Sequence, residues 1–441
     1  MDVRGFLQAA EERGWLQRVA TPVSPRLEMA RLIHALGEEL TLFEAVEGWP
    51  SGVVAGLCGR RRNLALALGV DEQTLLATLV AALRAPSPLE EVATAPCQEC
   101  VVEAVDLGAL PVLTHFAEDG GPYVTSGVLI TRDPERGPNA AYHRLMRVGP
   151  RSFTARLVEG RGTHRAWARS GGDLPVAVCI GAPLNVQLAA AMSPEPGVDE
   201  LRIASALAPT PVVRALGSDL LVPAESEIVL EGRLTHDLGD EGTFVDLTRT
   251  RDVVRQQPYL IVERITHRRE PLYQALLPGG MEHKLLMGLP REPTIYEAVS
   301  AVCECTNVAM TPGGGYWLHA VVQIRPRGPE DGRRAIEAAF RGHTSLKHVV
   351  VVDEDVDPTD PAAVEWAIAT RFQADRDLVV LEEQPSSSLD PSARQVPGEK
   401  ARTAKMGLDA TRPWGADPRA YEVVEYEPVD LARYTIRGDA S

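Results

Sequence analysis

Cysteine, aromatic residues and long apolar runs are all scarce in this sequence. Six cysteines in 441 residues are too few for a disulfide scaffold, and aromatic residues make up only 5%. No apolar run approaches the roughly 20 residues that a membrane-spanning helix needs. The first residues, MDVRGFLQAAEERGWLQRV, carry charges inside an amphipathic pattern, unlike a secretory signal. We therefore expect a cytoplasmic protein that makes no contact with a membrane.

Basic residues are also in short supply. Lysine and arginine number 45 against 61 acidic residues, which gives a formal net charge of −16. Nucleic acids are bound through clustered basic side chains that displace counterions, so this balance excludes an extended nucleic-acid surface. An anionic small molecule would need a local basic pocket instead.

Several short functional motifs are missing. There is no GxxxxGK[ST] phosphate loop, no HExxH and no GxSxG, which excludes P-loop ATPases, zincins and α/β-hydrolases. The pairs Cys97/Cys100 and Cys303/Cys305 could supply thiolates to zinc, because CxxC is a common half-site. The second pair, however, is CxC inside the apparently helical run TIYEAVSAVCECTNV. We therefore favour buried, reduced thiols over a zinc site.

The order of sequence patterns predicts an α+β fold of two units. Residues 1–90 read as helical and then mixed, and after residue 100 short β-rich runs predict a barrel or sandwich-like sheet, among them SGVLITRD, RSFTARLV, LPVAVCIG, ESEIVLEGRL and PYLIVERITH. A connecting helix is expected at EPTIYEAVSAVCEC. Strand and helix patterns then alternate, as in a smaller α/β unit, up to a Ser- and Pro-rich tail after Pro385.

Polar residues interrupt runs that otherwise resemble core. Asn139, His143 and Arg144 break the strand-like segment NAAYHRLMRV, and Glu200 opens a helix-like run after a Pro/Gly turn. Burying an unpaired charge costs several kcal/mol, so these side chains need partners or a ligand. The alternative interpretation is that each lies on a rim or in a surface ion pair.

The segment DLGDEGTFVDLTRTRD adds two carboxylates, Glu241 and Asp246. A regular strand would send residues five apart to opposite faces, so a shared site requires an irregularity, for which Gly242 is suited. An arginine between two acids can handle protons: one acid holds the guanidinium in a bidentate pair while the other, desolvated, delivers a proton. A chance acidic turn is the competing interpretation.

Six segments together resemble the UbiD family of prenylated-FMN decarboxylases, closest to its furan dicarboxylate and heteroaromatic acid branch. In chain order they are PYVTSGVLITRDPE, NAAYHRLMRV, GTHRAWARSGGDLPVAVCIGAPL, VPAESEIVLEGRL, DEGTFVDLT and KMGLDAT. The resemblance implies a β-rich, split-barrel-like flavin-binding domain over residues 1–298. A linker helix, a smaller α/β oligomerisation domain and a C-terminal tail would follow over residues 299–441.

The resemblance also implies a ligand set. Asn139, His164 and Glu200 would hold Mn²⁺ or Mg²⁺ beneath the flavin phosphate, and this donor set suits such ions. A K⁺ or Na⁺ ion would lie near Ala140 and Met192. The implied cofactor-binding residues are Asn139, Ala140, Tyr142, His143, Arg144, His164, Met192, Glu200 and Lys405.

The implied catalytic network is Glu241, Arg144 and Asp246. The third position is more often Glu in the family, so the shorter Asp246 departs from the pattern and alters the proton-transfer geometry. His283 and Arg291 match positions near the distal carboxylate in the furan dicarboxylate branch. A salt bridge within that loop is the alternative for the pair.

The resemblance implies reversible, non-oxidative decarboxylation of an aromatic, heteroaromatic or α,β-unsaturated acid, with furan-2,5-dicarboxylate as one candidate substrate. A decarboxylase of a phosphorylated alkenoic acid, a non-catalytic flavin-binding subunit and a hydro-lyase or isomerase on the same scaffold are the alternatives. The implied partners are a flavin prenyltransferase that supplies the cofactor and further copies of the chain, in a homodimer or homohexamer.

Overall fold

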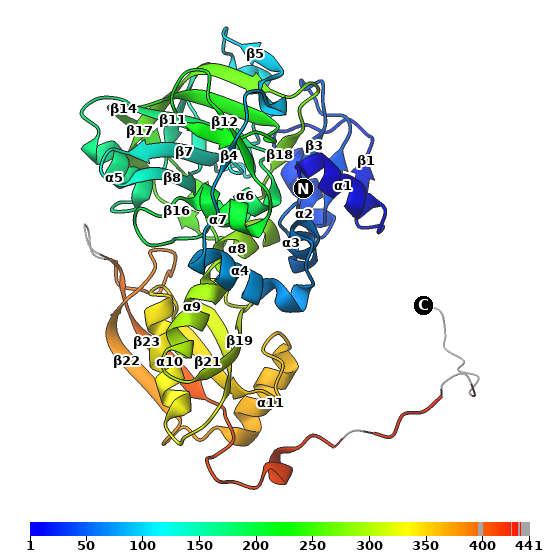
Figure 1. The fold of residues 1–441 in the computed structure, drawn as a ribbon, viewed down its shortest axis with the longest axis vertical. Helices are drawn as coiled ribbons and strands as arrows, with labels where there is room; N and C mark the ends of the chain where they lie inside the picture. The colour runs from blue at the N-terminus through cyan, green and yellow to red at the C-terminus, as the bar shows by residue number, and fades with distance from the viewer. Residues whose placement is uncertain (396–399, 425, 431–432, 434–441) are drawn as a thin grey trace.

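The chain forms two bodies joined by short helices. The computed structural model describes residues 1–395, 400–424, 426–430 and 433. One body is built around a large sheet and the other around a smaller one, with helices α4, α8 and α9 between them (Figure 1). From the smaller body the described C-terminal residues run away as an extended segment (Figure 1).

The first part of the large body is a small sheet with helices around it. Helix α1 begins after Asp2, whose carboxylate accepts a hydrogen bond from the Gly5 N–H. Strands β1, β2 and β3 lie in that order in the sheet, and β3 pairs with β18, which returns from much later in the chain. The elements are α1 (Val3–Glu11), β1 (Gln17–Val19), α2 (Glu28–Ala35), β2 (Thr41–Phe43), β3 (Val53–Ala55), α3 (Arg61–Leu68), η1 (Glu72–Thr74), α4 (Leu75–Arg84) and β18 (Tyr273–Ala275).

The large sheet has the order β6-β9-β10-β17-β14-β11-β7-β8, with β5 added to β17, in the described part of the chain. Its path has two free ends, so the barrel-like sheet predicted from the sequence does not close. The strands are β5 (Cys100–Val102), β6 (Tyr123–Val124), β7 (Val128–Asp133), β8 (Gly137–Tyr142), β9 (Leu145–Arg147), β10 (Ser152–Ala155), β11 (Leu174–Ile180), β14 (Ile228–Glu241) and β17 (Arg255–His267).

Strand β11 explains why the centre of this sheet reads as a continuous apolar run. It pairs antiparallel with β14 on one side and with β7 on the other. Val176 and Val178 face one hydrophobic core, whereas Ala177 and Cys179 face another. Both faces of the strand are therefore buried, and alternation between apolar and polar residues is lost.

Helices and short strands cover the large sheet and lead to the second body. They are β4 (Glu90–Glu91), η2 (Pro96–Gln98), η3 (Leu107–Ala109), α5 (Gly162–Arg169), α6 (Leu184–Ala190), α7 (Glu200–Leu207), β12 (Pro211–Arg214), β13 (Leu221–Pro223), β15 (Phe244–Val245), β16 (Arg251–Asp252), α8 (Met281–Gly288) and α9 (Arg291–Ser300). Helix α7 begins at Glu200, as the sequence predicted, with Asp199 as its N-cap.

The second body is the α/β unit expected from the alternating patterns. Its sheet has the order β19-β20-β21-β23-β22, and β20, β21 and β23 run parallel. Helices α9 and α10 pack on one face, and α11 packs on the other. The elements are β19 (Glu304–Met310), β20 (His319–Arg325), α10 (Asp331–Gly342), β21 (His348–Asp353), α11 (Pro361–Arg371), β22 (Leu378–Pro385), β23 (Arg402–Asp409) and η4 (Pro418–Tyr421).

Two sequence predictions about this half were wrong in detail. The connecting helix ends at Ser300, and Cys305 lies in strand β19 rather than in a helix. The tail predicted after Pro385 contains strand β23, which pairs parallel with β21 inside the sheet. On its other side β23 pairs antiparallel with β22, so it lies between the preceding strand and one more than fifty residues away in the sequence.

Among the described residues, no single helix has the length and apolar character needed to cross a bilayer. One pair of helices passes that test only when taken together, Arg61–Leu68 with Glu72–Arg84, and it bends by 87° at its break.

Glu292 joins the two bodies. It is fully buried near the start of α9 and accepts hydrogen bonds from Arg61 Nη1 of α3, at 2.8 and 3.0 Å, and from the Met310 N–H of β19 at 3.0 Å. Burial raises the pKa of Glu292, and the charge of Arg61 opposes that rise. The carboxylate thus fixes the connecting helix against both bodies.

We predict that Arg61→Ala lowers the free energy of unfolding by about 3 kcal/mol near neutral pH, because Glu292 keeps its buried charge without a partner. In the variant the Glu292 carboxyl binds a proton more tightly in the folded chain than in the unfolded chain. The free energy of unfolding therefore falls as pH rises above about 4.3, the ordinary pKa of a glutamate. The loss should shrink when urea melts are repeated at about pH 4.5. Arg84→Ala is the control, because Arg84 at the end of α4 pairs with Glu297 of α9, the helix that also carries Glu292, while both side chains are exposed. Equal losses in the two variants would contradict this account.

Candidate active site

Arg144 lies where a strand is interrupted. Strand β8 ends at Tyr142 and β9 begins at Leu145, so His143 and Arg144 occupy the break between them. The arginine side chain is only 9% exposed and enters the body of the protein instead of solvent. The polar interruption of NAAYHRLMRV seen in the sequence is therefore a point at which the backbone leaves the sheet.

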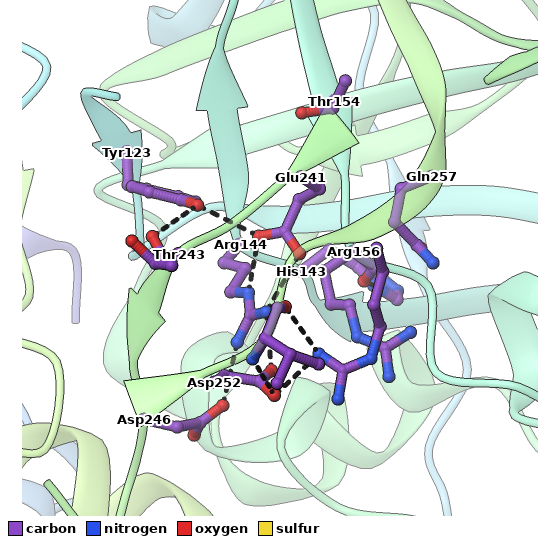
Figure 2. A network of polar contacts seen from close by, with 12 residues as sticks. Tyr123, His143, Arg144, Thr154, Arg156, Glu241, Thr243, Asp246, Asp252 and Gln257 are labelled. Atoms are coloured by element: carbon purple, nitrogen blue, oxygen red, sulfur yellow. Dashed lines mark hydrogen bonds and ion pairs between the residues drawn. The ribbon is translucent and has the colours of Figure 1, made fainter. Parts of the chain in front are cut away.

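Three carboxylates surround the Arg144 guanidinium (Figure 2). Nε and Nη2 donate to the two oxygens of Glu241 at 2.8 and 2.9 Å, which makes a bidentate pair. Nη1 donates to Asp246 Oδ2 at 2.9 Å, and Nη2 also donates to Asp252 Oδ2 at 2.8 Å. Burial would lower the pKa of Arg144, but these carboxylates raise it above its ordinary value. The guanidinium is therefore permanently charged.

The irregularity predicted at Gly242 brings the acids together. Strand β14 ends at Glu241, and Gly242 has φ +112°, a conformation that other residues rarely adopt. The chain then forms a separate hairpin in which Phe244 pairs with Asp252 and Val245 with Arg251. Glu241 and the hairpin acids can therefore reach one guanidinium.

An aromatic pair closes one side of this cluster. The Phe244 ring lies 4.4 Å from the Arg144 guanidinium carbon, and the Tyr123 ring lies 4.8 Å from that of Phe244. The Tyr123 hydroxyl donates to Glu241 Oε1 at 3.2 Å and lies equally far from the Thr243 carbonyl (Figure 2). Glu241 is thus fully buried with each oxygen satisfied, whereas Asp246 remains 20% exposed.

His283 lies beside the same acids. Burial lowers the pKa of His283 most, Asp246 opposes this effect, and Arg144 adds to it. Its Nδ1 accepts a hydrogen bond from the Gly279 N–H at 3.1 Å. The predicted substrate-binding histidine is therefore a neutral ring next to the predicted proton donor.

The predicted metal ligands lie on three elements that meet at β8. The Asn139 amide donates to Thr163 Oγ1 at 3.1 Å, next to His164 on α5. Glu200 Oε2 accepts from the Ala140 N–H at 2.9 Å, next to Asn139. Gly162 is required here, because any side chain on it would overlap the Asn139 amide oxygen.

Glu200 is a buried carboxylate without a cationic side chain beside it in the described part of the chain. It is 8% exposed, and it forms no ion pair with any side chain of the described residues. Burial raises the pKa of Glu200 to about 7. Among the described residues there is no cluster of three or more His, Cys, Asp or Glu side chains that could hold a metal. A site at Glu200 would thus depend on the Asn139 amide, on His164 and on oxygens from a ligand.

The other predicted cofactor residues differ in what they contact. His143 is buried with both ring nitrogens occupied, by the Arg156 carbonyl and by Thr163 Oγ1, each at 2.8 Å, and burial lowers its pKa to about 4. The Tyr142 hydroxyl points to Gln187 in the core. His143 thus connects the end of β8 to α5, and Tyr142 connects it to α6. Met192 is buried just beyond helix α6.

A cationic cluster spans the junction of the two bodies. Arg291 Nη2 donates to the Ala191 carbonyl and to Ser193 Oγ, on either side of Met192. Its Nε is buried without a hydrogen-bond partner, and burial followed by the charge of Arg161 lowers the pKa of Arg291 to about 10. The loop salt bridge considered for Arg291 is absent from the described residues, since neighbouring Glu292 pairs with Arg61.

Lys405 and His343 belong to the same cluster. Lys405 Nζ donates to the Thr344 carbonyl at 2.9 Å, and burial lowers its pKa to about 8. Burial, together with the charges of Arg291 and Lys405, lowers the pKa of His343 to about 3, so its ring is neutral near pH 7. Within the described residues, neither Lys405 nor Arg161 has a carboxylate partner. The cluster is therefore suited to bind an anion.

Sequence reasoning missed several of these residues. Asp252 was inside the quoted acidic segment, and a hairpin centred on Thr248 would have placed it opposite Phe244. Tyr123 lies in the quoted segment PYVTSGVLITRDPE, but nothing there indicates contact with Glu241. Arg291 was predicted as a substrate-binding residue, but Arg161 was not, because the two are about 130 residues apart and no local pattern links them.

Models of a known family match almost the whole described chain. They are the N-terminal, Rift-related and C-terminal domains of 3-octaprenyl-4-hydroxybenzoate carboxy-lyase, over residues 7–83, 89–281 and 284–410. The chain belongs to the UbiD family. As a UbiD-type enzyme it is a carboxy-lyase, which does not favour the interpretation as a non-catalytic subunit.

Relatives of known activity are similar along most of their length. The anhydromevalonate phosphate decarboxylase of Methanosarcina mazei is 42% identical over 417 residues, 93% of this chain and 96% of that protein. The enzyme of the same name from Methanothermobacter thermautotrophicus is 39% identical and covers 93% of this chain and 97% of its own.

Solved structures have the same fold. The UbiD-class enzyme HmfF from Pelotomaculum thermopropionicum, in complex with FMN, superposes with a TM-score of 0.93 at 37% identity, over 98% of this chain and 99% of that one. The apo 3,4-dihydroxybenzoic acid decarboxylase of Klebsiella pneumoniae gives 0.90 at 26% identity, with 98% of both chains covered.

We predict that Arg144→Ala lowers the free energy of unfolding by about 3 kcal/mol, because it leaves Glu241 charged and buried without its partner. Adding Glu241→Gln removes that charge, so the double variant should recover at least half of the loss in urea melts. Strictly additive losses would show that the two side chains do not interact.

Proposed function

We propose that this protein uses prenylated FMN to decarboxylate a phosphorylated α,β-unsaturated acid of the anhydromevalonate phosphate type. The observation that carries the proposal is Arg291, whose Nε is buried without a hydrogen-bond partner, together with the nearby charge of the exposed Arg161. Neither arginine has a carboxylate partner among the described residues. A phosphate group supplies two negative charges and several acceptor oxygens to such a pair. The 42% identity to an anhydromevalonate phosphate decarboxylase supports the same substrate class.

This substrate class replaces furan-2,5-dicarboxylate as the preferred candidate. A distal carboxylate would match a single arginine, whereas Arg291 is joined here by Arg161, His343 and Lys405. In the proposed assignment, Arg291 and Arg161 bind the substrate phosphate, and Lys405 serves the cofactor phosphate. His283 then lines the reacting end of the site next to Asp246.

The residues present fit a flavin phosphate capped by a divalent cation. Glu200 is a buried carboxylate without a cationic partner, and Lys405 is a buried ammonium without an anionic one. We propose that Asn139, His164 and Glu200 hold Mn²⁺ or Mg²⁺, with K⁺ or Na⁺ near Ala140 and Met192. When bound, prenylated FMN accepts the electrons that remain when CO₂ departs.

The chain's own groups orient the substrate and move the proton. Arg144 positions the substrate carboxylate, and Glu241 fixes the guanidinium through its bidentate pair. Once CO₂ has left, Asp246 passes its proton to the carbon that carried the carboxylate and becomes ionised. Its 20% exposure allows it to recover a proton from solvent between turnovers.

We also propose the division into a catalytic domain, residues 1–298, and an oligomerisation domain, residues 299–441. Helix α9 (Arg291–Ser300) crosses this boundary, so most of the connecting helix belongs to the first segment. Contacts between the smaller bodies would build a homodimer or homohexamer, and a flavin prenyltransferase would supply the cofactor.

We expect protein produced together with a flavin prenyltransferase to release CO₂ from anhydromevalonate phosphate. Its kcat/KM should exceed that for the dephosphorylated acid and for furan-2,5-dicarboxylate by about 100-fold or more, since a site built for a phosphate rejects analogues without one. Arg291→Gln should raise KM for the phosphorylated acid only. A preference for furan-2,5-dicarboxylate would refute the substrate assignment.

Removing the carboxylate of Glu200 should abolish tight metal binding. With FMN present, Glu200→Gln should weaken Mn²⁺ binding by more than about 100-fold, the upper end of what outer-shell changes cost. The signal of free Mn²⁺ in electron paramagnetic resonance measures this affinity. The control is Glu195→Gln, because Glu195 is exposed in the turn before α7. Unchanged binding in the Glu200 variant would remove this residue from the metal site.

A further inference from the structure

Asp252 has a different environment from the other two acids around Arg144. Its Oδ2 accepts from Arg144 Nη2 at 2.8 Å, and its Oδ1 pairs with Arg255 Nη1 at 2.7 Å and accepts from the Val253 N–H at 2.9 Å. Each of its oxygens therefore faces an arginine. Burial would raise the pKa of Asp252, but its hydrogen bonds to Arg255 and Arg144 outweigh burial and lower it.

The hairpin places Asp252 beside the other groups of the site. It pairs with Phe244, whose ring lies against the guanidinium. Asp246 begins the hairpin turn, where its N–H donates to the Thr250 carbonyl. One short hairpin thus carries both the proposed proton donor and a second acid that stays ionised.

We propose that Asp252, backed by Arg255, is a positioning residue that holds Arg144 in place when Asp246 carries its proton. The inference rests on the proposed roles of Arg144 and Asp246. A protonated Asp246 is a weaker acceptor for Arg144 Nη1, and the guanidinium would otherwise keep only the Glu241 pair. Because Asp252 stays ionised, Arg144 Nη2 keeps a charged acceptor in the hairpin throughout turnover.

The charges support this role. Three acids and two arginines, Arg144 and Arg255, meet here, so protonation of Asp246 leaves two carboxylates opposite two guanidinium groups. The state that is ready to donate a proton is the one in which these charges balance. Without Asp252, that state would carry an excess positive charge beside the donor, which favours loss of its proton to solvent.

The test compares Asp252→Asn with the wild type and with Arg251→Gln. Arg251 lies next to Asp252 on the same strand, but its side chain pairs with Glu118 on the surface, where both groups are exposed. Asp252→Asn should lower kcat by about 10-fold or more, in line with the strength of a charge-assisted hydrogen bond, and change KM by less than about 3-fold. Arg251→Gln should leave both parameters unchanged.

Two further measurements separate positioning from loss of structure. Asp252→Glu keeps the charge and should restore part of kcat, and Arg255→Gln should lower kcat in the same direction without touching Arg144. As pH rises, kcat of Asp252→Asn should fall at a lower pH than kcat of the wild type. The reason is that Asp246 loses its proton more readily once the neighbouring negative charge of Asp252 is gone. The other groups that face Asp246 and stay in both proteins are Arg144, Glu241 and His283.

The outcomes are distinguishable. The proposed function itself would be overturned if the wild-type protein released no CO₂ from anhydromevalonate phosphate, from the dephosphorylated acid or from furan-2,5-dicarboxylate. If the wild type is active, a kcat within about 2-fold of it for Asp252→Asn would overturn the inference. So would a loss confined to KM, or an equal loss in Arg251→Gln.

Discussion

Burying a guanidinium is costly unless carboxylates neutralise its charge, and this requirement organises the candidate site. Arg144 enters the protein at the break between β8 and β9 and meets acids from the end of β14 and from the β15–β16 hairpin. An aromatic ring covers one of its faces. The interruption of the strand, the turn at Gly242 and the separate hairpin all serve to bring these groups together.

A second constraint acts at the junction of the two bodies. Arg161 and Arg291 from the first body approach Lys405 and the neutral ring of His343 from the second. The three cations have no acidic partners within the described residues. The uncompensated charge favours an anion between the bodies. Glu292 at the same junction needs no ligand, because it already accepts hydrogen bonds from Arg61 of the first body and from Met310 of the second. These bonds hold the connecting helix in place.

Much of this arrangement could be predicted from local sequence. The interrupted strand indicated Arg144, the acidic segment indicated Glu241 and Asp246, and the glycine between them indicated the irregularity. The strands of the second body followed from their apolar runs. These features are local, since each depends on residues within one element or one turn.

The remaining features depend on contacts that no local pattern records. Asp252 joins the site only through pairing across a two-residue hairpin strand. The place of β23 inside the sheet depends on its parallel pairing with β21, which is distant in sequence. The approach of Arg161 to Arg291 depends on where the turn before α5 lies relative to the start of α9. Burial, which alters the pKa values of Glu200 and Lys405, likewise follows from tertiary packing and not from the residues alone.

The most direct test of this cluster of Arg144 and its acids is the exchange of hydrogen for deuterium in the reaction product, measured by NMR in D₂O. The wild-type holoenzyme should place deuterium on the carbon that loses CO₂ without any added substrate, because Asp246 moves the proton in both directions. Asp246→Asn should still bind product, but its exchange rate should be lower than that of the wild type by at least about 100-fold. Exchange by that variant at the wild-type rate would contradict the account.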